Sequence, residues 1–272
     1  TYDLAETAPL SSQQYGGVGI EHIGGKICFL AHIGGDYQTV SAGTPIEKGV
    51  FYHVIGTYDK EKGELRLYVN GKREQALSVS GSLKLPDADT RWMGIGGDMN
   101  SHTGSTQYPL NGDIALARIY SEAITDEAAL SLYRELPDTQ TETSRPKADL
   151  IDVTFQPDGS VTNPANQTIA IETGNQAPAI HYNPIYGSYA AHFTGSDRCF
   201  YKIDYSRHTA LQQAITNGFS IETMYQTNSV GTQTPFSSQQ YGGFGLEQSN
   251  RLLQFYAFID GNYVTLEADT PI

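Results

Sequence analysis

The residues best suited to bind a ligand lie in a polar segment, Ser-Ser-Gln-Gln-Tyr-Gly-Gly, that occurs twice. Its binding candidates are Gln13, Gln14, Tyr15, Gln239, Gln240 and Tyr241. Amides pair with sugar hydroxyls, and a tyrosine ring can stack on the face of a pyranose. The segment therefore predicts a carbohydrate-binding edge. The alternative is a polar turn whose glycines permit a positive φ or a bulge beside a strand.

Catalytic candidates are weaker. An acidic cluster of Asp59, Glu61 and Glu64 is interleaved with Lys60 and Lys62, a pattern typical of a solvated turn. The sequence contains no Gly-x-Ser-x-Gly, His-Glu-x-x-His, phosphate-binding glycine loop or paired Cys-x-x-Cys. We therefore predict that the chain is not an enzyme.

The two cysteines, Cys28 and Cys199, are far apart and belong to no recognised motif. We expect both to be buried as small apolar residues, with a disulfide between them as the alternative. The single tryptophan, Trp92, starts a Trp-Met-Gly-Ile-Gly-Gly run that reads as a central strand, so we expect its ring in the core.

The clearest strand signal is a hairpin. Phe51–Asp59 is rich in aromatic and β-branched residues, Glu64–Val69 alternates polar and apolar side chains, and Asn70-Gly71 then predicts a type I′ turn. Further strands are expected at Gly17–Glu21, Ile27–Ile33, Tyr37–Ser41, Trp92–Gly96, Asp113–Tyr120, Leu150–Phe155, Tyr189–Phe193, Phe200–Asp204, Phe219–Tyr225, Gly243–Glu247, Leu252–Ile259 and Tyr263–Glu267. Many short strands separated by turns predict an all-β sandwich.

Helical patterns are few. Thr125–Leu136 predicts the one long helix, because Thr125 can cap it and two acidic residues follow at the positive end of the helix dipole. A second short helix is expected at Arg207–Ile215.

Acidic residues dominate the charge, with 30 Asp and Glu against 17 Lys and Arg and a net charge of −13. Nucleic-acid binding and adhesion to anionic membranes both need clustered basic residues, so we predict neither. No apolar run approaches the about 18 residues that span a bilayer, so we predict no membrane insertion. The composition fits a soluble secreted protein with an acidic surface.

The chain also repeats itself. Residues 1–46 align without a gap to residues 227–272, and 21 of the 46 pairs are identical. We therefore expect a window cut from a tandem array. Residues 1–136 would be the rear part of one repeat, 137–147 a linker, and 148–272 the front part of the next repeat.

Six segments carry a resemblance to a known family: Phe219–Tyr225, Tyr52–Asp59, Glu64–Lys72, Trp92–Asp98, Gly112–Tyr133 and Tyr186–Gly195. Together they resemble the laminin-G-like jelly-roll modules of the concanavalin A-like lectin and glucanase superfamily, in the form common in secreted bacterial proteins. Read as 148–272 followed by 47–136, the chain is similar to one complete module. The resemblance implies a two-sheet antiparallel jelly-roll sandwich with one or two short helices.

The resemblance also bears on chemistry. Catalytic members of the superfamily carry Glu-x-Asp-x-x-Glu on one strand, which is absent here. Many members hold a structural Ca²⁺ between the first and last strands. The usual acidic position falls on Ala115 in this chain, which leaves Asp113, with Asp152 or Asp158 from the other strand, as the calcium candidates.

The resemblance implies a non-catalytic carbohydrate-binding or adhesion module of a secreted, periplasmic or surface bacterial protein, with a polysaccharide or glycan as its partner. One alternative is a structural spacer without a ligand, attached to a catalytic domain such as a phosphoesterase or glycoside hydrolase. Another is hydrolysis at an unrecognised site, which requires two carboxylates about 5–10 Å apart in a cleft.

The incomplete repeats constrain folding, because neither the rear part nor the front part can close two sheets over a core alone. The favoured arrangement is an intramolecular sandwich, in which residues 1–46 and 227–272 compete for one set of strand positions. The alternatives are strand exchange between chains in an oligomer, and a sequence that omits or reorders residues of a larger chain.

Overall fold

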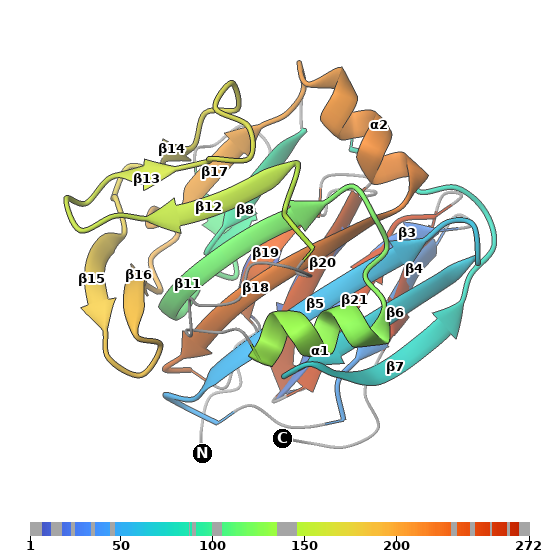
Figure 1. Ribbon diagram of the computed structural model, residues 1–272, viewed down its shortest axis with the longest axis horizontal. Helices are drawn as coiled ribbons and strands as arrows, with labels where there is room; N and C mark the ends of the chain where they lie inside the picture. Colours follow the sequence, from blue (N-terminus) through green and yellow to red (C-terminus); the bar gives the residue numbers. More distant parts are fainter. Residues whose placement is uncertain are drawn as a thin grey trace.

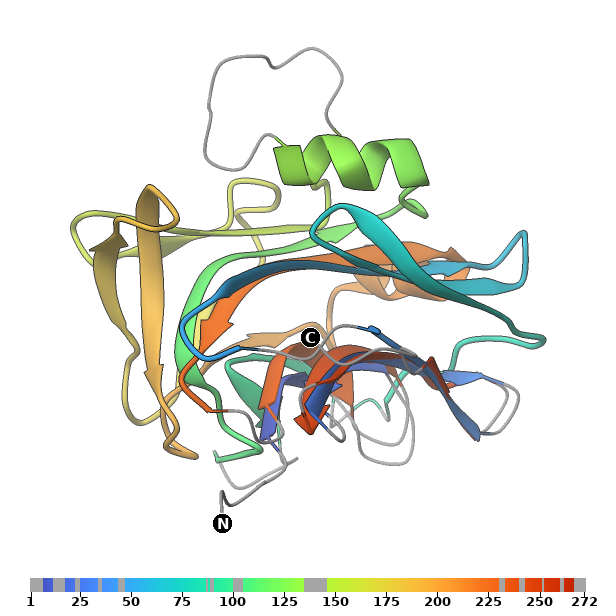
Figure 2. The same ribbon diagram turned by 90° about the horizontal axis from the view of Figure 1, so that it is seen from below.

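The computed structural model describes residues 7–11, 18–22, 25–33, 36–43, 47–86, 88, 91–99, 105–134, 146–229, 233–239, 243–250, 252–259 and 262–266. In this part of the chain two β-sheets pack face to face, and two short helices, α1 (Asp126–Arg134) and α2 (Thr209–Asn217), flank them (Figures 1 and 2). The fold is the two-sheet, largely antiparallel sandwich that the sequence predicts, with two short helices.

The first sheet lies beneath α1, and we call it the helix-covered sheet (Figure 2). Its strands follow the order β13-β12-β11-β18-β5-β6-β7, with the hairpin β15–β16 attached to β11. Their bounds are β5 Phe51–Asp59, β6 Glu64–Val69, β7 Lys72–Ser78, β11 Asn111–Tyr120, β12 Ile151–Phe155, β13 Val161–Thr162, β15 Ala179–Asn183, β16 Ser188–Thr194 and β18 Phe219–Thr227.

The central strand of this sheet is β18, which pairs antiparallel with β5 on one side and β11 on the other. The strands β5 and β11 precede residues 137–147, the predicted linker, in the sequence, and β18 follows them. The front and rear portions of the sequence are therefore joined along two strand boundaries within one chain.

The second sheet contains equivalent strands from both copies of the repeat, and we call it the duplicated sheet. Its order is β10-β9-β1-β2-β3-β22-β4-β21-β20-β19-β8-β17-β14. The bounds are β1 Thr7–Ser11, β2 Val18–His22, β3 Gly25–Ile33, β4 Asp36–Ser41, β8 Trp92–Ile95, β9 Gly97–Met99, β10 Thr106–Gln107, β14 Glu172–Thr173, β17 Tyr201–Asp204, β19 Gln233–Gln239, β20 Gly243–Asn250, β21 Leu252–Ala257 and β22 Asn262–Leu266.

We name residues 1–46 the N-segment, residues 227–272 the C-segment, and residues 47–226 the body. The strands β1 to β4 belong to the N-segment, and β19 to β22 are their equivalents in the C-segment. Both sets lie in the same sheet, where β2 pairs parallel with β20 and β3 with β21. Strand exchange between chains stays a prediction.

The hairpin prediction is confirmed. Asn70 and Gly71 both have positive φ, 50° and 76°, as a type I′ turn requires, and they connect β6 to β7. The amide of Asn70 donates to the carbonyl of His53, and the Asn70 side chain accepts from the His53 amide at 3.0 Å. The turn is thus tied to β5 as well.

Both helices lie close to their predicted positions with shifted ends. The helix α1 begins at Asp126 rather than Thr125, whose hydroxyl accepts from the amide of Ala128 as a capping side chain. The predicted end, Leu136, lies outside the described residues. The helix α2 spans Thr209–Asn217, two residues later than predicted, and Gly218 follows it with a positive φ of 120°.

The core fills the space between the sheets. Alternate residues of β5 and β18, among them Val54, Tyr58 and Ile221, face the duplicated sheet and are fully or almost fully buried. A second apolar cluster lies on the other face, under α1, and includes Ile55, Tyr68 and Leu132. The helix therefore covers apolar surface that would otherwise be exposed to solvent.

The cysteine prediction is confirmed, and the tryptophan prediction is wrong. Cys28 and Cys199 are both buried, and the two are not joined in a disulfide. Trp92 is only partly buried, and the Lys202 ammonium lies 4.1 Å from its ring centroid. Side chains alternate along the strand, so the neighbouring residue Met93 faces the core instead.

In the part of the chain that is described, no helix has the length and apolar character to cross a membrane.

The glycine in the hairpin turn gives a stability prediction. At Gly71 a methyl group would lie 2.8 Å from the Cβ of Tyr133 and 3.2 Å from the Cα of Leu130, on a backbone with φ +76°. We expect Gly71→Ala to lower the free energy of unfolding by more than about 1 kcal/mol, measured by urea denaturation.

The matched control is Gly49→Ala. Gly49 has nearly the same φ, +74°, but nothing within 4 Å of the added methyl group. The Gly49→Ala variant adds backbone strain without a steric clash, so it should lower the free energy of unfolding less than Gly71→Ala does. Equal losses in the two variants would show that the contact between the turn and α1 does not matter.

Candidate functional site

The predicted carbohydrate edge is not part of the described structure. Gln13, Gln14, Tyr15, Gln240 and Tyr241 lie outside the described residues. Gln239 is the last residue of β19, and only its backbone is described. Its binding role stays a prediction.

The three calcium candidates lie in three separate environments. Asp152 on β12 accepts from Arg118 Nε at 2.7 Å. Asp158 lies in an exposed turn, where its carboxylate accepts from the amide of Ser160. Asp113 on β11 is almost completely buried and has its own set of partners. The structure thus does not bring these carboxylates together, and no group of three or more potential metal ligands occurs among the described residues.

Asp113 instead organises a cluster of side chains that donate hydrogen bonds to it. His192 Nδ1 lies 2.7 Å from one carboxylate oxygen. Gln226 Nε2 at 2.5 Å and Asn183 Nδ2 at 3.3 Å donate to the other oxygen, and His181 Nε2 lies 3.7 Å from it. Calcium binds oxygen ligands, so these nitrogen donors do not form a calcium site. We call these five residues the Asp113 cluster.

The fold explains why the Asp113 cluster assembles. Asp113 pairs with His192 across the β11–β16 boundary and with Gln226 across the β11–β18 boundary. The hairpin β15–β16 adds Asn183 and His181, whose ring centroid lies 6.1 Å from that of His192. The two imidazole side chains are 43 % and 40 % exposed, whereas the carboxylate is 5 % exposed. A buried acceptor thus holds the His192 imidazole, and a second imidazole, His181, lies beside it where solvent can reach both.

The same hairpin carries exposed apolar surface. Tyr182 is 56 % exposed and packs edge to face against Tyr189, with ring centroids 5.7 Å apart. Ile185 in the connecting turn is 69 % exposed. Because side chains alternate along a strand, Tyr182 lies on the opposite face of β15 from His181. The hairpin therefore presents a tyrosine face and a polar face at one end of the sandwich (Figure 1).

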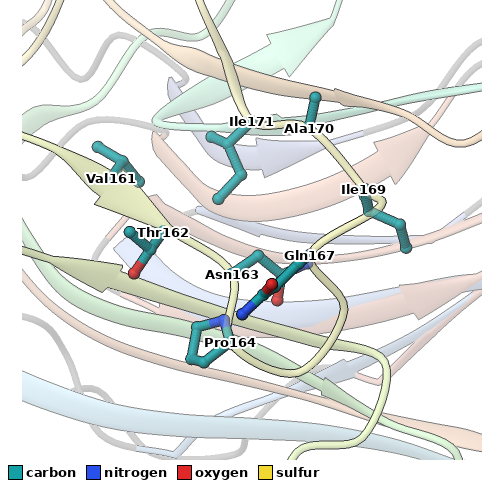
Figure 3. A pocket seen from close by; sticks show the side chains of 8 residues that line it. All are labelled: Val161, Thr162, Asn163, Pro164, Gln167, Ile169, Ala170 and Ile171. Carbon is teal, nitrogen blue, oxygen red and sulfur yellow. The ribbon is translucent and has the colours of Figure 1, made fainter.

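A hollow of about 430 Å³ beside β13 is a second candidate (Figure 3). Its lining residues are Val161, Thr162, Asn163, Pro164, Gln167, Ile169, Ala170 and Ile171. The Asn163 amide is already occupied, since its oxygen accepts from the amide of Asp152 and its nitrogen donates to the carbonyl of Asn166. Asn163 therefore holds the loop together rather than offering its polar atoms to a ligand.

The most strongly perturbed carboxylate is Glu222 on β18, which sequence reasoning missed. It accepts from His53 Nε2 at 2.7 Å and from the Tyr120 hydroxyl at 2.5 Å, and Arg118 Nη1 lies at 3.4 Å. Burial acts to raise the pKa of Glu222, but the Arg118 charge and the hydrogen bonds from His53 and Tyr120 lower it to about 2. The signal in the sequence was a glutamate inside the otherwise apolar strand FSIETMY.

No substrate can reach this network, because Glu222 and His53 have no exposed surface. Tyr133 of α1 stacks on the His53 ring, with centroids 5.9 Å apart. Arg118 continues the network to Asp152 on β12. The Glu222 network is therefore a structural link between strands rather than a reaction site.

The acidic cluster at the β5–β6 turn differs from the solvated turn that the sequence predicts. Asp59 is 7 % exposed, accepts from Arg66 Nη2 at 2.8 Å, and pairs with Lys62 at 3.1 Å. Although burial opposes the shift, the hydrogen bonds from Lys62 and the charges of Arg66 and Lys62 lower the pKa of Asp59. Only Glu61 matches the prediction, as an exposed residue.

The Glu222 network predicts acid sensitivity. The pKa of Glu222 is lower in the folded chain than in the unfolded chain. Between these two pKa values the unfolded chain therefore binds more protons than the folded one. Stability should therefore be fully present above about pH 4.5 and decline toward pH 2, as measured by thermal melting across that range.

Glu222→Gln should remove a fully buried charge that accepts from His53 and Tyr120 and pairs with the partly buried Arg118, and should cost about 3–5 kcal/mol at neutral pH in urea denaturation. Asp158→Asn is the control, because that carboxylate is fully exposed, and it should melt like the wild-type protein. A Glu222→Gln protein that retains wild-type stability and acid response would contradict the assignment.

Comparison with known proteins supports the fold. Residues 4–129, somewhat less than half of the chain, match the family model described as the concanavalin A-like lectin/glucanases superfamily, of the laminin G type. No curated protein and no solved structure matches the chain significantly. The matched region runs from the N-segment through the hairpin β5–β6 and β11 into α1. Residues 4–129 of this chain are therefore similar to the concanavalin A-like lectin/glucanase superfamily.

Proposed function

We propose that this chain is a non-catalytic carbohydrate-binding or adhesion module that contacts a glycan through the hairpin β15–β16. The observation that carries the proposal is the Asp113 cluster, in which a buried carboxylate holds the half-exposed His192 imidazole and lies beside a second one, His181, at the edge of the sandwich. The match of residues 4–129 to a superfamily of lectins and glucanases supports it as an analogy of fold.

The polar face of the hairpin suits sugar hydroxyls. An imidazole nitrogen that is not bonded to Asp113 faces a ligand as donor or acceptor, depending on its tautomer. Because Asp113 fixes the ring orientation, little side-chain entropy is lost when a hydroxyl binds. Calcium is not required by this arrangement, since nitrogen donors surround the carboxylate.

The tyrosine face suits the apolar side of a pyranose. Tyr182 is more than half exposed, and its edge-to-face contact with Tyr189 fixes the ring. A fixed aromatic ring offers a large contact area at low entropic cost. We propose that a polysaccharide contacts both the tyrosine face and the polar face at the end of the hairpin, and that this contact serves adhesion.

The carboxylates support a non-catalytic role. Glu222 is fully buried and balanced by Arg118, and Asp59 is balanced by Arg66. Asp113 is enclosed by amide and imidazole nitrogens. A retaining or inverting glycosidase needs two carboxyl groups that reach the same glycosidic bond, and these groups are each committed elsewhere. We place the module outside the cytoplasm, in the periplasm, at the cell surface or secreted, where polysaccharides occur.

A glycan array followed by titration calorimetry tests the proposal. We expect a polysaccharide ligand with a Kd at or below about 100 μM. Tyr182→Ala and His192→Ala should each weaken binding about 3- to 10-fold. Tyr182→Ala should leave the melting temperature close to wild type, whereas His192→Ala should also lower it, because the buried Asp113 carboxylate loses a hydrogen-bond partner.

The control is Tyr133→Ala, which removes another partly exposed tyrosine, on α1, and should not change affinity. If no glycan binds at about 100 μM, the spacer interpretation is correct and the proposal is wrong. Glycan binding that is unchanged in both hairpin variants would place the site elsewhere.

A further inference from the structure

The N-segment and the C-segment occupy equivalent positions in the duplicated sheet. Ile20 lies opposite Leu246 and Phe29 opposite Phe255 in parallel register, and each partner is the residue that the sequence repeat aligns with it. The Phe29 and Phe255 rings are nearly coplanar and share one position over Gly56 of β5. His32 and Phe258 likewise share one position.

Two side chains cannot fill one volume, because protein interiors are already packed at the density of organic crystals. The body offers only one such position for Phe29 or Phe255, between Gly56 and the ring of Phe219. A sandwich built on this body therefore accommodates one segment at a time.

The inward-facing residues show that either segment can complete the core. The pairs Phe29/Phe255, Ala31/Ala257 and Ile33/Ile259 are identical in type and buried in both copies. Ile20/Leu246 preserves volume. The outward-facing partners differ in chemistry instead, as in Leu30/Tyr256 and His32/Phe258.

We propose that the N-segment and the C-segment are alternative occupants of a single four-strand position in the duplicated sheet, and that each is sufficient to complete the sandwich. The segment that occupies the position determines the outer face of that sheet. The N-segment places Cys28, Leu30 and His32 there, and the C-segment places Tyr256 and Phe258. Exchange of the segments would change this face from a mixed to an aromatic one while the core stays the same.

Matched substitutions in the full chain test the proposal. Phe29→Asp and Phe255→Asp place a charge at the same core position in one segment or the other, so the impaired segment should leave and the intact one should remain. Each single variant should melt cooperatively at nearly the wild-type temperature, whereas the double variant should lose the cooperative transition.

Hydrogen exchange with mass spectrometry identifies the occupant. In Phe29→Asp, amide protection should be lost in β3 and kept in β21, and in Phe255→Asp the reverse. Phe219→Asp is the control, because Phe219 is fully buried in the body and has no equivalent in either segment. That variant alone should abolish the transition.

The outcomes are exclusive. Cooperative melting in both single variants with complementary loss of protection supports alternative occupancy. If either single variant unfolds as completely as Phe219→Asp, then its segment is indispensable and the proposal is wrong. If β3 and β21 are both protected in both single variants, the two segments do not compete, which also overturns it.

Discussion

The buried carboxylate of Glu222 is the interaction on which the helix-covered sheet depends. It lies on the central strand β18 and accepts hydrogen bonds from His53 on β5 and Tyr120 on β11. These partners come from before the linker, while Glu222 comes from after it. If Glu222 lost these partners while it stayed buried, the uncompensated charge would cost several kcal/mol. The network therefore ties β18 to β5 and β11 in the folded sheet.

The two sheets differ in which parts of the chain form them. The helix-covered sheet consists of body strands together with the first residue of the C-segment, Thr227. It is stabilised by the Glu222 network, by the packing of α1, and by the turn at Asn70 and Gly71. In the duplicated sheet, the N-segment and the C-segment have the same pattern of core-facing residues, so both fit the same place opposite β5. The chain therefore has more strands for this place than the sheet can accommodate. The proposed glycan contact lies on β15–β16, which pairs with β11 and not with either segment. Its Gln226 and Asp113 also belong to the body, so the site does not depend on which segment is in the sheet.

Local patterns in the sequence predicted much of this fold and little of the site. The hairpin β5–β6 and its turn followed from alternation and from Asn70-Gly71, because strand period and positive φ are local properties. The burial of Asp59 was missed, since its partner Arg66 becomes adjacent only after β5 and β6 pair. The Asp113 cluster was missed for the same reason, as His181 and His192 lie about 70 to 80 residues from Asp113 in sequence. Trp92 was misplaced by one strand position, because an apolar run does not reveal which face of the strand is buried.

The central claim is that strands from before and after the linker form one sandwich within a single chain. The pair Thr57 and Ser220 tests it directly, because these small residues face each other across β5 and β18 with hydroxyl oxygens 2.9 Å apart. The measurement is mass analysis of the oxidised Thr57→Cys/Ser220→Cys protein, with peptide mapping of the cross-link. The structure predicts a disulfide between positions 57 and 220 in a monomer whose mass falls only by the two hydrogen atoms lost on oxidation. Covalent dimers linked through the same two positions would contradict it and show that the sheet is completed by a second chain.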